Sequence, residues 1–567
     1  MSKNRAYKVI TMAVLAIMLL TSCSAQQPAP APAAQPTTAP EQPTAAPAQS
    51  TTAPEPTKAP EPTAVPEPVA AKPFVFAHTG PIRTLDAPVT WYGSTHWLTN
   101  LLFDCLIWRK SDGSGYVGQA AEKWENVDPT TWRFYLREGL TFHNGEPLDA
   151  EAVKWNIERV MSRKDFQVQP QWEFIDKVTV IDPTTVEITT DEPHAYFEYD
   201  VSYNGCELLP PAYLQEVGEE KFGTAPVGSG PYKLAKLVLN EKYEFEAWDG
   251  YWGGKQPVEK VIYQVIPEKA SQMAALLAGQ VSLVAGVPIP DLPRVEAAQD
   301  IKTMSESSNR LHMLYLRSEI ESGNMAKKYP DYKPATLDIR IRQAISHALD
   351  RTLLAEVQGT ATPTLVRLSR NDPESYAEKY AGTQVADEWY DPDLAKQLIK
   401  EAGYDPDNGN KPKLYFDAPA AYFGNEKEVA EAIKAMLEEV GFEVELSILD
   451  RSAYFEQIDE PGNNRDMILV TLGGGASLIP TFYTCDWWES TYHVCEKEWS
   501  DLGEEMIKTV DPVKRKEMWG TWWEYFIDFA QTVPLYELDN VYAMDASFNW
   551  EPRADGWMTF RELTPAK

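Results

Sequence analysis

The segment from Ser24 to Pro73 most constrains what this chain can fold into, because it consists almost entirely of Pro, Ala, Thr, Gln and Glu. A segment of this composition cannot bury a hydrophobic core. Proline-rich chains favour extended conformations of about 3.1 Å per residue, so about 50 residues could span on the order of 100 Å or more. We therefore expect residues 23–73 to form a disordered tether, and residues 74–567 to contain the folded part.

Residues 1–22 are predicted to be an export signal. Three basic residues precede an apolar run from Val9 to Leu20. This run is too short for a membrane-spanning helix, which needs about 20 apolar residues. The following Leu20-Thr21-Ser22-Cys23 resembles a bacterial lipobox, in which the cysteine is lipidated and becomes the mature N-terminus. We expect an extracytoplasmic protein whose lipid anchor at Cys23 holds it on the cell membrane. The alternative is an ordinary signal with an incidental cysteine.

Charge and length limit the class of the folded part. The formal net charge of -32 would repel nucleic acid, so we expect no nucleic-acid partner. About 490 residues are enough for two or three domains with large cores. We expect the protein to be a monomer.

The four remaining cysteines allow three pairings. They are Cys105, Cys206, Cys485 and Cys495. Export permits disulfides, and a bond between Cys485 and Cys495 would close a short loop and leave Cys105 to pair with Cys206. The alternative is buried free thiols, especially for Cys105, which lies in an apolar run.

Helical and strand patterns alternate along the folded part, which indicates a mixed α/β fold. Apolar residues at helical spacing, with Asp and Pro at the start and Gly beyond the end, predict helices at 149–160, 391–399 and 426–440. Short β-rich runs predict strands at 132–136, 178–181 and 442–446.

Several motifs lie in order along the folded part, at 121–125, 132–148, 227–232, 251–254, 274–281, 338–351 and 391–403. Together they resemble extracellular solute-binding protein family 5, the dipeptide-, oligopeptide-, nickel- and oligosaccharide-binding components of ATP-binding-cassette (ABC) importers. The resemblance implies a type II (cluster C) periplasmic-binding-protein fold, with two α/β lobes joined by a hinge and an additional domain inserted in lobe one. It also implies a small-molecule ligand between the lobes and the importer's permease subunits as partners.

This architecture suggests boundaries along the chain. We expect lobe one at 74–110, 225–305 and 529–567, the inserted domain at 111–224, and lobe two at 306–528.

Peptide-binding members of the family usually carry an acidic residue, in a pattern like Asp-x-x-Asp-Pro, that pairs with the peptide amino terminus. The corresponding stretch, Leu472 to Pro480, contains no carboxylate. A buried ammonium without its counter-charge costs several kcal/mol, so this absence weakens the dipeptide interpretation unless another acid such as Asp486 substitutes. Aromatic side chains near both expected cleft walls suit sugar rings. An oligosaccharide is therefore an alternative to a peptide.

The candidate ligand-binding residues are aromatic or glycine residues in the expected cleft. They are Trp91, Tyr92, Tyr422, Phe423, Gly474, Gly475, Trp487 and Trp488. Packing in the core is the alternative for the aromatic ones. Trp519, Trp522 and Trp523 are better explained as the buried face of a helix.

Enzymatic and metal-dependent functions find little support. The seven histidines form no i,i+4 pair, and Gly-x-Ser-x-Gly, Walker and His-Glu-x-x-His motifs are missing from the sequence. We therefore predict a binding protein rather than an enzyme, with no metal and no cofactor. A receptor that feeds a sensor is the first alternative, and a glycoside-processing enzyme is a remote one.

Overall fold

A computed structural model describes residues 72–80, 82–90, 93–317, 333–366, 378–380, 382–420, 424–450, 453–454, 465–473, 497–553 and 555–566. The chain divides into two compact units, Met1–Pro68 and Val69–Lys567, and every described residue belongs to the second. Among these residues, no helix combines the length and apolar character that crossing a membrane requires.

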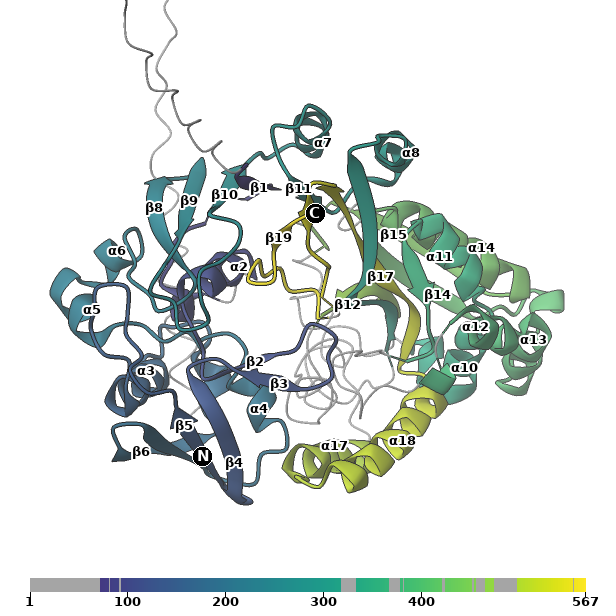
Figure 1. Ribbon diagram of the computed structural model, residues 1–567. Coiled ribbons are helices and arrows are strands. Elements are labelled where there is room, and N and C mark those ends of the chain that lie inside the picture. The colour runs from purple at the N-terminus through teal and green to yellow at the C-terminus, as the bar shows by residue number, and fades with distance from the viewer. Residues whose placement is uncertain are drawn as a thin grey trace, which may run out of the picture. The chain divides into compact units, whose positions relative to one another are not determined.

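Eleven strands of the described chain form one mixed sheet (Figure 1). Their spatial order is β15 (Glu443–Leu449), β14 (Lys413–Pro419), β16 (Met467–Leu472), β12 (Ile301–Leu316), β17 (Thr532–Asp545), β11 (Leu283–Ala285), β1 (Phe74–His78), β10 (Lys260–Val265), β9 (Lys242–Ala247) and β8 (Tyr232–Val238), with β13 (Ala361–Pro363) also pairing with β17. We call β8–β11 together with β1 the first strand group, and β14–β16 the second strand group.

The long strands β12 and β17 connect the two strand groups. They pair antiparallel from Ile301 opposite Asp545 to Tyr315 opposite Thr532. β11 of the first group pairs with one end of β17, and β16 of the second group pairs with the other end of β12. Side chains alternate between the two faces of a strand, so successive residues of β17 join different hydrophobic clusters. Both faces of this strand are therefore buried.

Helices lie on one side of the second strand group (Figure 1) and help to bury that face of its strands. They are α10 (Ile339–His347), α11 (Arg351–Gln358), α12 (Thr383–Trp389), α13 (Pro392–Glu401) and α14 (Glu426–Val440). Asp338, Asp350 and Asp391 cap α10, α11 and α13 by accepting backbone N–H bonds. Gly441 ends α14 in a left-handed conformation, with φ 114°, that favours glycine.

The first strand group is accompanied by smaller helices and a short ladder near the C-terminus. These elements are α2 (Gly93–Leu102), α5 (Pro211–Val217), α6 (Glu219–Phe222), α7 (Lys269–Leu277), α8 (Leu292–Glu296), β18 (Phe548–Asn549) and β19 (Thr564–Pro565). Phe74 and Phe76 of β1 pack against Phe560 of the C-terminal segment. The last residues of the described chain thereby complete the core that its first strand begins.

A separate four-stranded antiparallel sheet lies between α2 and β8 in the sequence. Its order within the described chain is β4 (Ala121–Asp128), β5 (Thr131–Leu136), β7 (Thr185–Thr190) and β6 (Ile175–Asp182). Helix α3 (Ala150–Ser162) packs on it, and Asp149 caps that helix by accepting the Ala152 N–H at 3.0 Å. The hairpin of β2 (Ile107–Arg109) and β3 (Tyr116–Gly118) precedes the sheet, and α4 (Phe197–Asp200) follows it.

The elements predicted from the sequence are confirmed. The strands expected at 132–136, 178–181 and 442–446 are found in β5, β6 and β15, and the expected helices are α3, α13 and α14. Trp519, Trp522 and Trp523 are buried in α18 (Pro512–Phe529), which packs on α17 (Lys497–Lys508). The domain boundaries stay a prediction.

Candidate ligand-binding site

Parallel strands of the second group point their carboxyl ends toward the middle of β12. β16 runs antiparallel to β12, from Met467 opposite Leu316 to Leu472 opposite Leu311. β14 is parallel to β16, so its carboxyl end lies on the same side. Ligands of open α/β sheets bind beyond such carboxyl ends.

The first group points its carboxyl ends toward the same place from the other direction. β11 pairs with β17 from Leu283 opposite Met544 to Ala285 opposite Tyr542, and β1 is parallel to β11. Tyr542 in turn pairs with Met304 of β12. The ends of both groups therefore converge on residues 307–311 of β12 and 537–539 of β17, which we call the junction.

The eight candidate ligand-binding residues lie outside the described residues, in connections that follow these strand ends. Trp91 and Tyr92 come after β1, Tyr422 and Phe423 after β14, and the other four after β16: Gly474, Gly475, Trp487 and Trp488. Their part in binding stays a prediction. Cys23, Cys485 and Cys495 also lie outside the described residues.

Side chains hold the junction where the backbone ladder is interrupted. The register between β12 and β17 shifts between Ser307 and Arg310. The Ser307 hydroxyl donates to Glu537 Oε2 at 2.8 Å, and the Ser308 hydroxyl donates to the Leu538 carbonyl at 2.7 Å. A register irregularity bends a strand locally. The sheet is thus bent and fixed by side-chain bonds where the strand ends converge.

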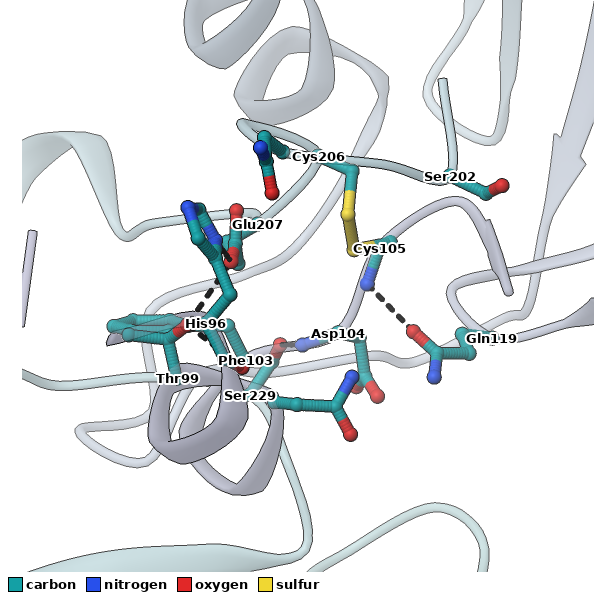
Figure 2. The surroundings of a disulfide bond; sticks show 12 residues. His96, Thr99, Phe103, Asp104, Cys105, Gln119, Ser202, Cys206, Glu207 and Ser229 are labelled. Carbon is teal, nitrogen blue, oxygen red and sulfur yellow. Dashed lines mark hydrogen bonds and ion pairs between the residues drawn. A yellow bond between two sulfur atoms is a disulfide. The ribbon is translucent and has the colours of Figure 1, made fainter. Parts of the chain in front are cut away.

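A disulfide joins the start of the β2–β3 hairpin to the segment after α4 (Figure 2). Cys105 and Cys206 are bonded, 101 positions apart in the sequence. This is the pairing expected from the sequence, and the thiols are not free. The Cys105 N–H also donates to Gln119 Oε1 at 2.8 Å. Closing a loop of about 100 residues stabilises the folded state by about 5 kcal/mol in the chain-entropy treatment.

Glu207, directly after the disulfide, forms a buried ion pair with His96 of α2 (Figure 2). Glu207 Oε1 accepts from His96 Nδ1 at 2.7 Å and from the Thr99 hydroxyl at 2.9 Å. His96 Nε2 lies 2.8 Å from the carbonyl oxygen of Thr90. A carbonyl only accepts, so both ring nitrogens donate once Glu207 is ionised, and His96 is an imidazolium.

The charge state of this pair follows from its partners. Burial by itself would lower the pKa of His96, but the Glu207 carboxylate and the Thr90 carbonyl outweigh it and raise the pKa. Burial would raise the pKa of Glu207, and His96 outweighs that effect and lowers the pKa. Thr90 is the last described residue before Trp91. The pair therefore fixes the backbone from which one expected ligand-binding segment continues.

A second buried histidine lies in β12 next to the junction. His312 Nδ1 is 2.9 Å from the Tyr536 hydroxyl, which donates to Gln358 Oε1 at 3.3 Å, so the hydroxyl accepts from His312. Burial lowers the pKa of His312 to about 4, against the opposing influence of Glu426 at 3.8 Å. Glu426 Oε2 also accepts the N–H of Gly424 at 3.1 Å. His312 is neutral at pH 7. Its hydrogen-bonded surroundings extend through Glu426 to Gly424, the first described residue after Phe423.

These polar groups were not identified as site residues from the sequence. His96 and Glu207 are 111 positions apart, and His312 and Tyr536 are 224 positions apart. Charged or polar residues at such separations carry no local spacing signal. In the described segments, no group of three or more His, Cys, Asp or Glu residues could hold a metal ion.

The architecture is a mixed α/β periplasmic-binding-protein fold, and the convergence of strand ends at one junction is the arrangement of a solute-binding protein. Residues 115–494, more than half of the chain, match the family described as bacterial extracellular solute-binding proteins, family 5 Middle. The chain belongs to this family. The family is one of binding proteins, so the sequence-based prediction that the chain is not an enzyme is confirmed.

Known relatives are similar over most of the chain. The glutathione-binding protein GsiB of Escherichia coli (strain K12) is 24% identical over 408 residues, 69% of this chain and 74% of the relative. The dipeptide-binding protein of the same strain is 24% identical over 481 residues, 79% of this chain and 86% of the relative. The crystal structure of the ABC transporter substrate-binding protein CtaP of Listeria monocytogenes superposes with a TM-score of 0.74 at 21% identity, covering 88% of this chain and 99% of CtaP.

Proposed function

We propose that this chain is the substrate-binding protein of an ABC importer and that it captures a peptide between its two strand groups. The observation that carries the proposal is the convergence of the parallel-strand ends of both groups on the junction. A ligand there contacts both groups, and its greater affinity for the closed arrangement would shift the population toward closure. Micromolar affinity supplies roughly 8 kcal/mol for this purpose.

The names of the relatives support a peptide. By their names, GsiB binds glutathione, a small peptide-like solute, and the second relative binds dipeptides. CtaP is described as an ABC transporter component, which supports delivery to a permease. An oligosaccharide is the second candidate. It is favoured by the aromatic residues of the expected cleft and by the absence of a carboxylate in residues 472–480.

Delivery to a membrane permease requires the protein to stay near the membrane. We propose that residues 1–22 are removed, that Cys23 is lipidated and that residues 24–73 are the tether. Replacing Cys23 by Ser is expected to release the mature protein from the membrane fraction, and mass spectrometry of the unchanged protein is expected to show an acylated N-terminal peptide. An unacylated Cys23 in membrane-bound protein would contradict the anchor.

Calorimetry with the purified protein tests the ligand class. We expect short peptides to bind with micromolar affinity and oligosaccharides not to bind, and mass spectrometry of co-purifying material to reveal a peptide. Binding of oligosaccharides alone would refute the peptide proposal. A strain that lacks the permease separates an importer component from a receptor. For an importer component, the protein is expected to bind its ligand in this strain, but the cell should not import the ligand. A cellular response to the ligand that persists without the permease would support a receptor that feeds a sensor.

A further inference from the structure

Arg109, the last residue of β2, has a buried guanidinium that is only partly satisfied. Its side chain is 4% exposed, and Nε donates to Asp555 Oδ2 at 3.2 Å. Nη1 and Nη2 are also buried and have no hydrogen-bond partner among the residues that the structure describes. A buried donor without an acceptor carries its full desolvation penalty, which is larger for a charged group. The site therefore lacks an acceptor.

Four aromatic rings surround this guanidinium. Its Cζ atom lies 5.4, 5.1, 4.9 and 5.1 Å from the ring centroids of Trp108, Tyr199, Tyr203 and Trp557. Cation–π contacts of this kind stabilise the charge and fix the plane of the guanidinium. They do not replace the anion that two parallel N–H groups can bind.

The charges around Arg109 do not balance. Asp555 accepts from Arg553 through both oxygens, at 3.0 and 2.7 Å, and its Oδ2 is shared with Arg109. Burial by itself would raise the pKa of Asp555, but the two arginines outweigh it and hold the pKa below its usual value. Two guanidinium groups thus share one carboxylate, and one positive charge is in excess among these three buried residues.

A pocket of about 250 Å³ lies between the β2–β3 hairpin and the C-terminal segment. Its lining includes four basic residues, Arg109, Lys110, Arg553 and Arg561, and two acidic ones, Asp112 and Glu562. This volume accommodates the end group of a small ligand, and the excess of basic over acidic lining residues favours an anionic one.

The C-terminal segment of this pocket reaches the junction. A β-carbon at Gly556 would lie 3.2 Å from the carbonyl oxygen of Ser308, the junction residue whose hydroxyl bonds to Leu538. Gly556 has φ 68°, which favours glycine, so the close approach of the two backbones is built into the sequence. Asp555 and Trp557 flank this glycine and both contact Arg109. The Arg109 pocket and the proposed ligand site are therefore neighbours.

We propose that Nη1 and Nη2 of Arg109 bind the terminal carboxylate of the peptide ligand. This inference rests on the proposed peptide function and deepens it, because it assigns one end of the ligand to the first strand group. A carboxylate would accept two parallel N–H bonds and neutralise the excess charge. A neutral sugar could accept N–H bonds through its hydroxyl oxygens, but it could not neutralise the charge.

The unchanged protein gives the first test, which does not depend on the folding of any variant. Calorimetry compares a binding peptide with its C-terminally amidated form, and with an amidated form that carries an internal Glu. We expect the amidated peptide to bind on the order of 100-fold more weakly, the loss typical of breaking a buried charge pair. Recovery of affinity by the internal Glu would identify a side-chain carboxylate as the partner and overturn the terminal assignment. Equal affinity for the free acid and the amide would overturn the inference as a whole while leaving the peptide function intact.

Variants then locate the partner. In Arg109→Gln the preference for the free acid over the amide is expected to disappear, whereas Arg109→Lys keeps part of it. Lys123→Gln is the control, because Lys123 of β4 carries the same charge and is exposed, but does not line the pocket. We expect it to change affinity by about threefold at most, as an exposed charge does. A full preference in folded Arg109→Gln, or its loss in Lys123→Gln, would contradict the assignment. Failure of all peptides to bind the unchanged protein would instead remove the proposed function.

Discussion

Two buried histidines, His96 in α2 and His312 in β12, each lie next to a glutamate, yet they carry different charges. His96 lies 2.7 Å from Glu207 and donates its second N–H to a carbonyl, so it is positively charged. His312 lies 3.8 Å from Glu426 and donates to a tyrosine hydroxyl, so burial dominates and its pKa falls to about 4. Distance and the nature of the second partner, rather than residue type, decide the protonation state.

Removing the disulfide beside the His96–Glu207 pair is expected to have the largest effect on the free energy of unfolding. Replacing Cys105 and Cys206 by Ala should lower the free energy of unfolding by about 5 kcal/mol, because the unfolded chain is no longer cross-linked. Urea unfolding followed by tryptophan fluorescence measures this. A reducing agent should destabilise the unchanged protein more than the double variant, which retains only the bond expected between Cys485 and Cys495. Equal stability of oxidised and reduced protein would show that the bond does not hold this region.

Removing the counter-charge of His96 is expected to have the next largest effect. Glu207→Gln leaves a buried imidazolium without its carboxylate, which should lower the free energy of unfolding by about 3 kcal/mol. The variant should also weaken peptide binding, because the Thr90 carbonyl loses a fixed partner. Urea unfolding and calorimetry give the two values. Unchanged stability would mean that His96 is neutral, and the contrast between the two histidines would disappear.

The two histidines should respond to pH with opposite sign. His96, with a raised pKa, contributes stability that is fully present below the unfolded pKa of about 6.5 and is lost as pH rises through its folded pKa. Glu207, with a lowered pKa, contributes stability that is present above about pH 4.5 and is lost as pH falls through its folded pKa. His312 must stay neutral, so its effect is a loss of about 3 kcal/mol as pH falls from about 6.5 to 4.

Unfolding measured from pH 4 to 8 separates these contributions. His312→Gln should have a shallower decline of stability below pH 6.5 than the unchanged protein, and His96→Gln should lose the decline above that pH. Identical pH profiles for His312→Gln and the unchanged protein would contradict the assignment of a neutral His312.

The smallest effect is expected from the second glutamate. Glu426→Gln removes a carboxylate from a neutral histidine, and the amide oxygen can still accept the Gly424 N–H. We expect the free energy of unfolding to fall by about 1 kcal/mol, because a neutral amide oxygen accepts this N–H less strongly than a carboxylate does. This is about a third of the effect of Glu207→Gln. The same urea experiment measures both variants. Equal effects of the two substitutions would indicate that both pairs are charged.

Local patterns determined much of this protein. Helix caps such as Asp149 and Asp391, and the end of α14 at Gly441, depend on nearby residues and were read correctly from the sequence. The ordered motifs indicated the family, because they retain the spacing of a shared fold. The pairing of Cys105 with Cys206 was one of three possibilities in the sequence, and the structure selected it.

Only the tertiary structure decided the chemistry of the interior. The register of β12 and β17 brings the strand ends of both groups to one junction, and no sequence period encodes a register between strands more than 200 positions apart. Arg109 meets Asp555 446 positions away, and His96 meets Glu207 111 positions away. The protonation state of a buried group, and whether its donors find acceptors, depend on the groups next to it. These neighbours come from distant parts of the sequence, so only the folded structure brings them together.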